Sequence, residues 1–278
     1  ATHQLRRLEH LNRTIGRVER LTERLGETTE ALATTDSRKG LEHLAQRYHH
    51  LDTSYQRAEL ELNRMGYAGH WDALLEIIPV SGDQGLSGQF MQSLYQRWAE
   101  THRAEWEWLR VPLNPTEPRL VRVLGHYVYG YLRGEAGLHR VHGPDSHGAA
   151  RIRVLPLIDV GSLDRVEFID SRAIKGTEVH GQRIRSRLEC PRGFVLQNSR
   201  TLAENQDLAR ELYPCWPSDD GATSEVVRRY QVEPAHVRDV ATGWSSGRSD
   251  ALSGQAIATL LRLRAERIEP KGPPDSGD

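Results

Sequence analysis

The first 60 residues leave little choice of fold, because their apolar side chains recur at steps of three and four and so lie along one face of a helix. They form two stripes: Leu5, Leu8, Leu11, Ile15, Val18, Leu21 and Leu25, then Leu41, Leu44, Tyr48, Leu51 and Tyr55. Between the stripes, Gly26 and the stretch 34–37 (Thr-Thr-Asp-Ser) supply helix stop and start signals. Residues 1–70 are therefore predicted to form a helical hairpin or small bundle. Packing between these helices is the simpler interpretation of the stripes, and a partner-binding surface is the alternative.

Beyond Gly66 the pattern changes to short apolar runs separated by Gly, Pro, Asp and Ser. These runs predict strands at 74–80, 106–111, 119–124, 154–158, 165–169, 183–188 and 193–197. One helix is predicted over 87–102, and a segment at 225–232 precedes a turn at Glu233-Pro234 and a final helix over 253–268. The proline-rich and glycine-rich tail from residue 270 is predicted to be disordered. The fold class is therefore α+β multidomain, with the helical region first.

The composition excludes several classes of protein. No apolar run is long enough to span a membrane or to act as a signal core, so we expect a soluble, cytoplasmic protein with no membrane partner. The two cysteines, Cys190 and Cys215, lack the number and spacing that a disulfide framework or a structural zinc site requires. The sequence contains no Walker-type loop, dinucleotide fingerprint or Gly-Xaa-Ser-Xaa-Gly elbow. We expect no cofactor and no metal.

Three segments carry a family resemblance. Residues 94–100 read Leu-Tyr-Gln-Arg-Trp-Ala-Glu, and residues 125–141 read Gly-His-Tyr-Val-Tyr-Gly-Tyr-Leu-Arg-Gly-Glu-Ala-Gly-Leu-His-Arg-Val. Further along, residues 239–243 read Asp-Val-Ala-Thr-Gly and precede the predicted closing helix. In this order, the segments resemble the bacterial class I peptide release factors, most closely the type 2 branch.

The resemblance implies how the chain is divided. It implies a helical domain at 1–70, a central release-factor-like α+β domain at 71–158, an inserted domain at 159–222 that corresponds to the Gly-Gly-Gln domain, and a C-terminal segment at 223–278 that completes the central domain. In relatives, the inserted domain reaches the peptidyl-transferase centre. The implied partners are the ribosome at its A site, or tRNA and rRNA, with a protein partner possible through the N-terminal helices.

The family reads stop codons with a loop that follows its His-Arg-Val element. The corresponding residues here are His142, Gly143, Pro144, Asp145 and Ser146. Only Pro144 and the Asp145-Ser146 pair resemble the type 2 tripeptide and its flank, and the span 138–156 is several residues shorter than in relatives. Because RNA bases are read by side chains at fixed positions, we predict weak or absent stop-codon reading.

The family hydrolyses peptidyl-tRNA at its Gly-Gly-Gln tip. Alignment of residues 166–169 with the strand before that tip places Lys175, Gly176 and Thr177 on it, so one glycine remains and the glutamine is replaced. Lys175 is a poor substitute where the backbone must take a positive φ and approach RNA closely. The remaining catalytic candidates are Glu178, His180 and Gln182. His180 with Glu178 could act as base and orienting carboxylate, or the triplet 180–182 could be a relocated tip, but solvated side chains are the simpler interpretation.

Two groups of arginines could contact RNA, although the formal net charge is only −1. Arg183, Arg185 and Arg187 alternate with apolar or small residues, so a strand would place three guanidiniums on one face. Guanidinium forks suit phosphate, and a solvated edge with ion pairs is the alternative. The second group surrounds the shortened loop and includes a histidine: His139, Arg140, Arg151 and Arg153. Beside it, His142 or His147 could stack on a base.

The sequence thus favours a release-factor-like protein that binds the ribosome or tRNA/rRNA, with codon reading and peptidyl-tRNA hydrolysis lost or repurposed. On this interpretation it is not an enzyme. One alternative is a divergent peptidyl-tRNA or ester hydrolase with a rebuilt tip. Another is an adaptor that acts away from the ribosome and binds a protein through its helical hairpin.

Overall fold

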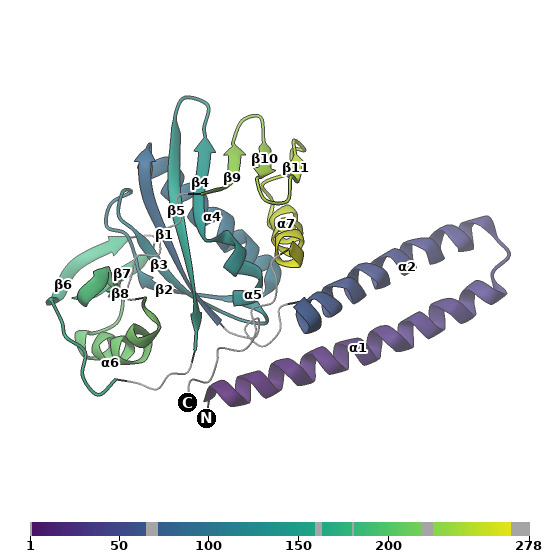
Figure 1. Cartoon of the computed structure of the whole chain (residues 1–278), viewed down its shortest axis with the longest axis horizontal. Helices are drawn as coiled ribbons and strands as arrows, with labels where there is room; N and C mark the ends of the chain where they lie inside the picture. Colours follow the sequence, from purple (N-terminus) through teal and green to yellow (C-terminus); the bar gives the residue numbers. More distant parts are fainter. Residues whose placement is uncertain (1, 65–71, 159–162, 180, 218–224, 268–278) are drawn as a thin grey trace. The chain divides into compact units, whose positions relative to one another are not determined.

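The computed structural model describes residues 2–64, 72–158, 163–179, 181–217 and 225–267. The chain divides into two compact units, the first containing the described residues up to 64 and the second those from 72 to 267 (Figure 1). None of the helices within these ranges has the length and apolar character needed to cross a membrane. The predicted tail from residue 270 lies outside the described residues.

Unit 1 is a helical hairpin, as the apolar spacing predicts. Helix α1 spans Thr2–Thr34, α2 spans Arg38–Glu59, and a π-helical turn, η1, follows at Leu60–Arg64. Ser37 begins α2, because its hydroxyl oxygen accepts a hydrogen bond from the Gly40 amide at 3.1 Å. The predicted helix stop at Gly26 is wrong: α1 continues through it, since a glycine inside a helix costs only about 1 kcal/mol.

Pairing of the two helices covers the apolar stripes only in part. Leu44 and Leu51 are buried, but a larger group of stripe residues is exposed: Leu5, Leu8, Ile15, Leu25, Leu41, Tyr48 and Tyr55. Ion pairs also hold the hairpin, because the fully buried carboxylate of Glu61 pairs with Arg17 and, at 3.0 Å, with Arg57. The stripes are therefore not fully used as a packing surface between α1 and α2.

Unit 2 has mixed α and β structure built on an eleven-stranded sheet with the order β11-β10-β9-β4-β5-β1-β3-β2-β8-β7-β6. The strands are β1 (Asp72–Gly82), β2 (Glu105–Arg110), β3 (Arg119–Leu124), β4 (Gly137–His142), β5 (His147–Leu157), β6 (Asp170–Val179), β7 (Gln182–Glu189), β8 (Val195–Asn198), β9 (Val226–Gln231), β10 (His236–Asp239) and β11 (Ser245–Ser246). The helices are α4 (Gln84–His102), α5 (Val128–Leu132), α6 (Leu202–Leu212) and α7 (Gly254–Arg267), with 3-10 turns η2 (Arg133–Glu135), η3 (Pro191–Gly193) and η4 (Tyr213–Cys215).

One predicted strand is absent from the described fold. Residues 165–168 pair with no strand, and β6 begins only at Asp170. The apolar side chains of this run, Val166 and Phe168, pack instead against the core that contains Leu188 and Phe194. Only the end of the run reaches the sheet, where the Ile169 amide donates to the carbonyl of Glu189 at 2.7 Å. The run is therefore apolar because it covers a core, and not because it is a strand.

Helices α4 and α5 pack on the central part of the sheet, α7 packs against α4 and α5, and α6 packs against β7 (Figure 1). Within α4, Tyr95 and Trp98 are buried in the core. The C-terminal segment enters the same sheet, because β9 pairs parallel with β4 and brings Arg228 beside His139. The sheet thus joins residues that lie almost 100 positions apart in the sequence.

Candidate functional site

The shortened loop is a tight connection between β4 and β5. The Gly143 amide donates to the carbonyl of Ser146 at 2.8 Å, and His142 and His147 pair across the two strands. The side chains of Pro144 and Asp145 are exposed at the turn. The loop therefore offers few side chains to a ligand.

Asp83, the residue before α4, fixes this loop. One of its carboxylate oxygens accepts from the Leu86 amide at 2.9 Å, and the other accepts from the Ser146 hydroxyl at 3.0 Å. The backbone hydrogen bond of Leu86 and the hydroxyl of Ser146 together lower the pKa of Asp83. A single carboxylate thus caps α4 and anchors the loop to it.

Substitution of Asp83 with alanine is expected to lower the thermal midpoint of unit 2 by a few degrees, because α4 loses its cap and Ser146 loses its acceptor. Differential scanning fluorimetry at neutral pH measures this. Asp145→Ala is the matched control, since it removes the same charge from the same surface at an exposed position and should leave the midpoint unchanged. Equal shifts in the two variants would show that the cap and the loop contact contribute nothing.

The residues aligned with the Gly-Gly-Gln tip lie inside a strand. Lys175, Gly176 and Thr177 belong to β6, where the pairing with β7 is irregular between Ala173 and Thr177. Strand β6 ends at Val179 and β7 begins at Gln182, and Gly181 just before β7 has a φ of 72°. His180 lies outside the described residues. The structure therefore puts the end of this hairpin next to Gln182 and not at Lys175.

Two of the catalytic candidates flank this connection. Gln182 pairs with Val179 and is half-buried, while Glu178 is exposed and lies opposite Arg183. Opposite charges directly across two strands stabilise a hairpin, so Glu178 can contribute to the stability of the β6–β7 pair from its place opposite Arg183. These positions bring one amide and one carboxylate close to the turn.

The three arginines of β7 alternate with buried residues, as predicted, but they are not equivalent. Arg183 and Arg185 are exposed, and Arg187 is half-buried. Arg187 donates to Glu189 at 2.8 Å and to the side-chain oxygen of Gln197 at 3.0 Å. The guanidinium of Arg187 is therefore committed to contacts within the protein, which leaves two of the three on the surface.

The arginines of the second group also differ from one another in their contacts. Arg153 lies 3.0 Å from Glu76, and its guanidinium lies over the ring of Trp216 at 5.1 Å. Arg140 is exposed, and Arg151 is half-buried with an Nε atom that has no hydrogen-bond partner among the described residues. Arg153 thus contributes to packing, whereas Arg140 and Arg151 remain candidates for ligand contact.

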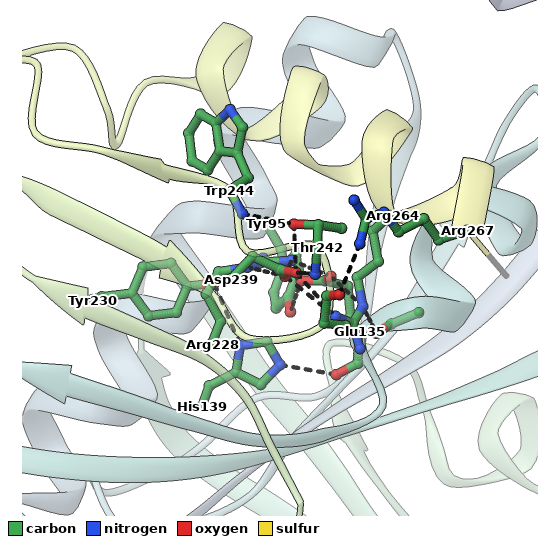
Figure 2. A network of polar contacts seen from close by, with 12 residues as sticks. Tyr95, Glu135, His139, Arg228, Tyr230, Asp239, Thr242, Trp244, Arg264 and Arg267 are labelled. Carbon is green, nitrogen blue, oxygen red and sulfur yellow. Dashed lines mark hydrogen bonds and ion pairs between the residues drawn. The ribbon is translucent and has the colours of Figure 1, made fainter.

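A buried ionic network, which the sequence did not predict, lies beneath α4 and α7 (Figure 2). At its centre the fully buried guanidinium of Arg228 donates to both oxygens of Glu135, each at 2.7 Å, and to Asp239 at 3.0 Å. Arg264 of α7 donates to Asp239 at 3.2 Å, and the Tyr95 hydroxyl donates to Glu135 at 3.0 Å. Two arginines therefore balance two carboxylates, so the burial of charge is compensated within the network.

The same network sets the protonation of its members. Burial by itself raises the pKa of Glu135, but the guanidiniums of Arg228 and Arg264 outweigh it, so the pKa is lowered. Asp239 follows the same pattern, with burial opposed by Arg228 and by the amide and hydroxyl of Thr242, so its pKa is also lowered. Both carboxylates are consequently ionised at neutral pH.

His139 is neutral in this network. Burial lowers its pKa to about 4, assisted by Arg228 and opposed by Glu135. Its Nε2 lies 2.9 Å from the backbone carbonyl of Glu135, which can only accept, so Nε2 carries the hydrogen. Its Nδ1 lies 3.4 Å from the Tyr230 hydroxyl, to which Arg228 donates at 3.0 Å. A buried neutral histidine with both nitrogens placed in this way is a structural group.

Comparisons with known proteins agree on the family. The family model described as the PCRF domain matches residues 1–152. The chain is 30% identical over 226 residues to peptide chain release factor 2 of Thermomicrobium roseum, a match that covers 69% of this chain and 56% of that protein. It is 33% identical over 90 residues to peptide chain release factor 2 of Paramagnetospirillum magneticum, covering 31% of this chain and 24% of that protein. The matched part of the chain therefore covers just over half of the first relative and about a quarter of the second.

A solved structure shares the fold. RF2 of Thermus thermophilus matches with a TM-score of 0.62 at 19% sequence identity, over 93% of this chain and 85% of that chain. At this identity the match concerns the arrangement of helices and strands.

Proposed function

The chain belongs to the family of proteins that contain the PCRF domain and is a divergent class I release-factor-like protein, and from this premise we propose that it binds the ribosome, through its A site or through tRNA and rRNA, without reading stop codons or hydrolysing peptidyl-tRNA. On this proposal it acts in the cytoplasm and is not an enzyme.

The observation that carries the proposal is the geometry of the two regions that do chemistry in release factors. The loop after β4 is closed by a hydrogen bond between Gly143 and Ser146 and is anchored to Asp83. Base reading requires side chains that project and hydrogen-bond at fixed positions, and the turn of this loop exposes Pro144 and Asp145, with the exposed rings of His142 and His147 on the strands beside it.

The hairpin of β6 and β7 supports the second half of the proposal. The positions aligned with the catalytic tip lie within β6, where Thr177 pairs with Ile184 and the register with β7 is irregular across Lys175 and Gly176. Lys175 stands in place of a glycine and Thr177 in place of the glutamine. A glycine-rich tip uses positive φ values to bring its backbone close to RNA, and a lysine at position 175 disfavours such values. The arrangement of helices and strands is shared with RF2. The exposed guanidiniums of Arg183 and Arg185 suit contact with RNA.

A release assay combined with ribosome co-sedimentation tests the proposal. Purified termination complexes with labelled peptide receive the wild-type chain, Gln182→Ala, or the control Gln255→Ala at an exposed position of α7. We expect all three to sediment with ribosomes and to release peptide no faster than the buffer blank. Stop-codon-dependent release that is lost in Gln182→Ala and kept in Gln255→Ala would establish a hydrolase with a rebuilt tip. Failure of the wild type to sediment would remove ribosome binding and favour the adaptor alternative.

A further inference from the structure

Three exposed arginines lie side by side on adjacent strands of unit 2. Arg140 of β4 is in register with Arg229 of β9, and Arg229 is in register with Arg238 of β10. All three side chains are exposed. Neighbouring strands lie about 4.8 Å apart, so these positions form a short, closely spaced line across the sheet, which we call the arginine row.

The arginine row lies on the face of the sheet that α4 and α7 do not cover. Each member is next in sequence to a residue of the buried network: Arg140 follows His139, Arg229 follows Arg228, and Arg238 precedes Asp239. Successive side chains of a strand point to opposite faces. Because the network residues point toward the helices, the arginine row points away from them.

The charge of the arginine row is not balanced within the described part of the chain. None of its three guanidiniums forms an ion pair there, in contrast to Arg153 and Arg187. Strands β5, β4, β9 and β10 together contain one acidic residue, Asp239, and it is buried on the opposite face. Arg151 of β5 adds to the row, since it lies diagonally from Arg140, whose partner in β5 is Ala149.

Like charges directly opposite one another destabilise a sheet, so the arginine row costs stability in the free protein. A ligand with closely spaced negative charges offsets this cost. Guanidinium forks bind phosphate oxygens in bidentate geometry, which a compact ammonium cannot do. The neighbouring exposed rings of His142 and His147, whose centroids lie 6.2 Å apart, are placed to stack on bases.

We propose that the arginine row, with Arg151 at its end, binds the phosphate backbone of an RNA strand. This inference rests on the proposed function and deepens it, because it names the contact surface as the open face of β4, β9 and β10. It adds Arg229 and Arg238 to the arginines that the sequence pointed to. Contacts to phosphate fix the position of a protein on RNA and carry no codon information, which agrees with docking in the absence of codon reading.

Fluorescence anisotropy with a fluorescein-labelled, unstructured RNA oligonucleotide tests the proposal on the full chain. The test variant is Arg140→Gln/Arg229→Gln/Arg238→Gln. The control is Arg38→Gln/Arg97→Gln/Arg248→Gln, which removes the same charge from three other exposed positions. Loss of three phosphate contacts should weaken binding on the order of tenfold or more at low salt and reduce the slope of log K against log salt by about 2. The control should keep the slope of the wild type.

Thermal unfolding without RNA separates lost binding from misfolding. Because the row repels itself, its triple variant should unfold at the same temperature as the wild type or higher, with the difference largest at low salt. A row variant that binds RNA with the affinity and salt slope of the wild type overturns the inference and leaves ribosome binding intact. A wild type that neither binds this RNA nor sediments with ribosomes overturns the proposed function and the inference together.

Discussion

Replacement of Arg228 with alanine is expected to lower the free energy of unfolding of unit 2 by about 3–5 kcal/mol. The guanidinium is fully buried and makes paired hydrogen bonds of 2.7 Å to Glu135, in addition to its contact with Asp239. Its removal leaves two carboxylates in the core with a single positive partner, Arg264, whose closest approach to Glu135 is 4.0 Å. Urea unfolding followed by circular dichroism measures the change.

The adjacent residue supplies the control. Arg229→Ala removes the same side chain from the same strand at an exposed position, so its effect should stay within about 0.5 kcal/mol. The double variant Arg228→Met/Glu135→Gln should recover part of the loss, because the cost comes from an unpaired charge and not from lost volume. If Arg228→Ala and Arg229→Ala were equally stable, the network would not hold unit 2 together.

Acidification is expected to destabilise unit 2 in two stages. The pKa of His139 is about 4 in the folded protein and 6.5 ordinarily, so between these values the unfolded chain binds more protons than the folded one. Stability should therefore fall as the pH drops from about 6.5 toward 4, by up to roughly 3 kcal/mol at about 1.4 kcal/mol per unit. The lowered pKa values of Glu135 and Asp239 add a second loss below their ordinary values of 4.5 and 3.8.

Unfolding measured across this range, with His139→Gln alongside, checks the first stage. Glutamine can donate to the carbonyl of Glu135 and accept from Tyr230 but cannot bind a proton, so the slope between pH 6.5 and 4 should shrink. His43→Gln, at an exposed position of α2 in unit 1, serves as the matched substitution outside unit 2. In NMR spectra the His139 ring should stay neutral down to about pH 5, and titration near 6.5 would contradict the assignment.

The periodic parts of the fold could be predicted from the sequence. The stripes of residues 5–25 and 41–55 specify a hairpin, and the alternation through Ile184, Ser186 and Leu188 specifies a strand with one buried face. The run at 165–169 misleads, because apolar residues that cover a core look like those of a strand. Gly26 misleads for the opposite reason, since the length of α1 outweighs one unfavourable residue.

The buried network could not be predicted, because the sequence does not show which of two neighbouring arginines is buried. Arg228 and Arg229 are identical in type, and only the register of β9 against β4 decides that the first meets Glu135 and the second meets solvent. A one-residue slip would exchange them. The arginine row was missed for the same reason, since its members come from three strands that the sequence separates by up to about 100 positions.

The link between Glu135 and Arg228 has a consequence for synthesis of the protein. The two residues are 93 positions apart, and a ribosome adds about 5–20 residues per second, so the carboxylate emerges roughly 5–20 seconds before its arginine. During that interval burial of Glu135 is unfavourable, and β4 has no parallel neighbour. The residues of the β6–β8 hairpin region emerge in between and can close locally. The central part of the sheet must therefore complete its folding late, when the last strands are translated.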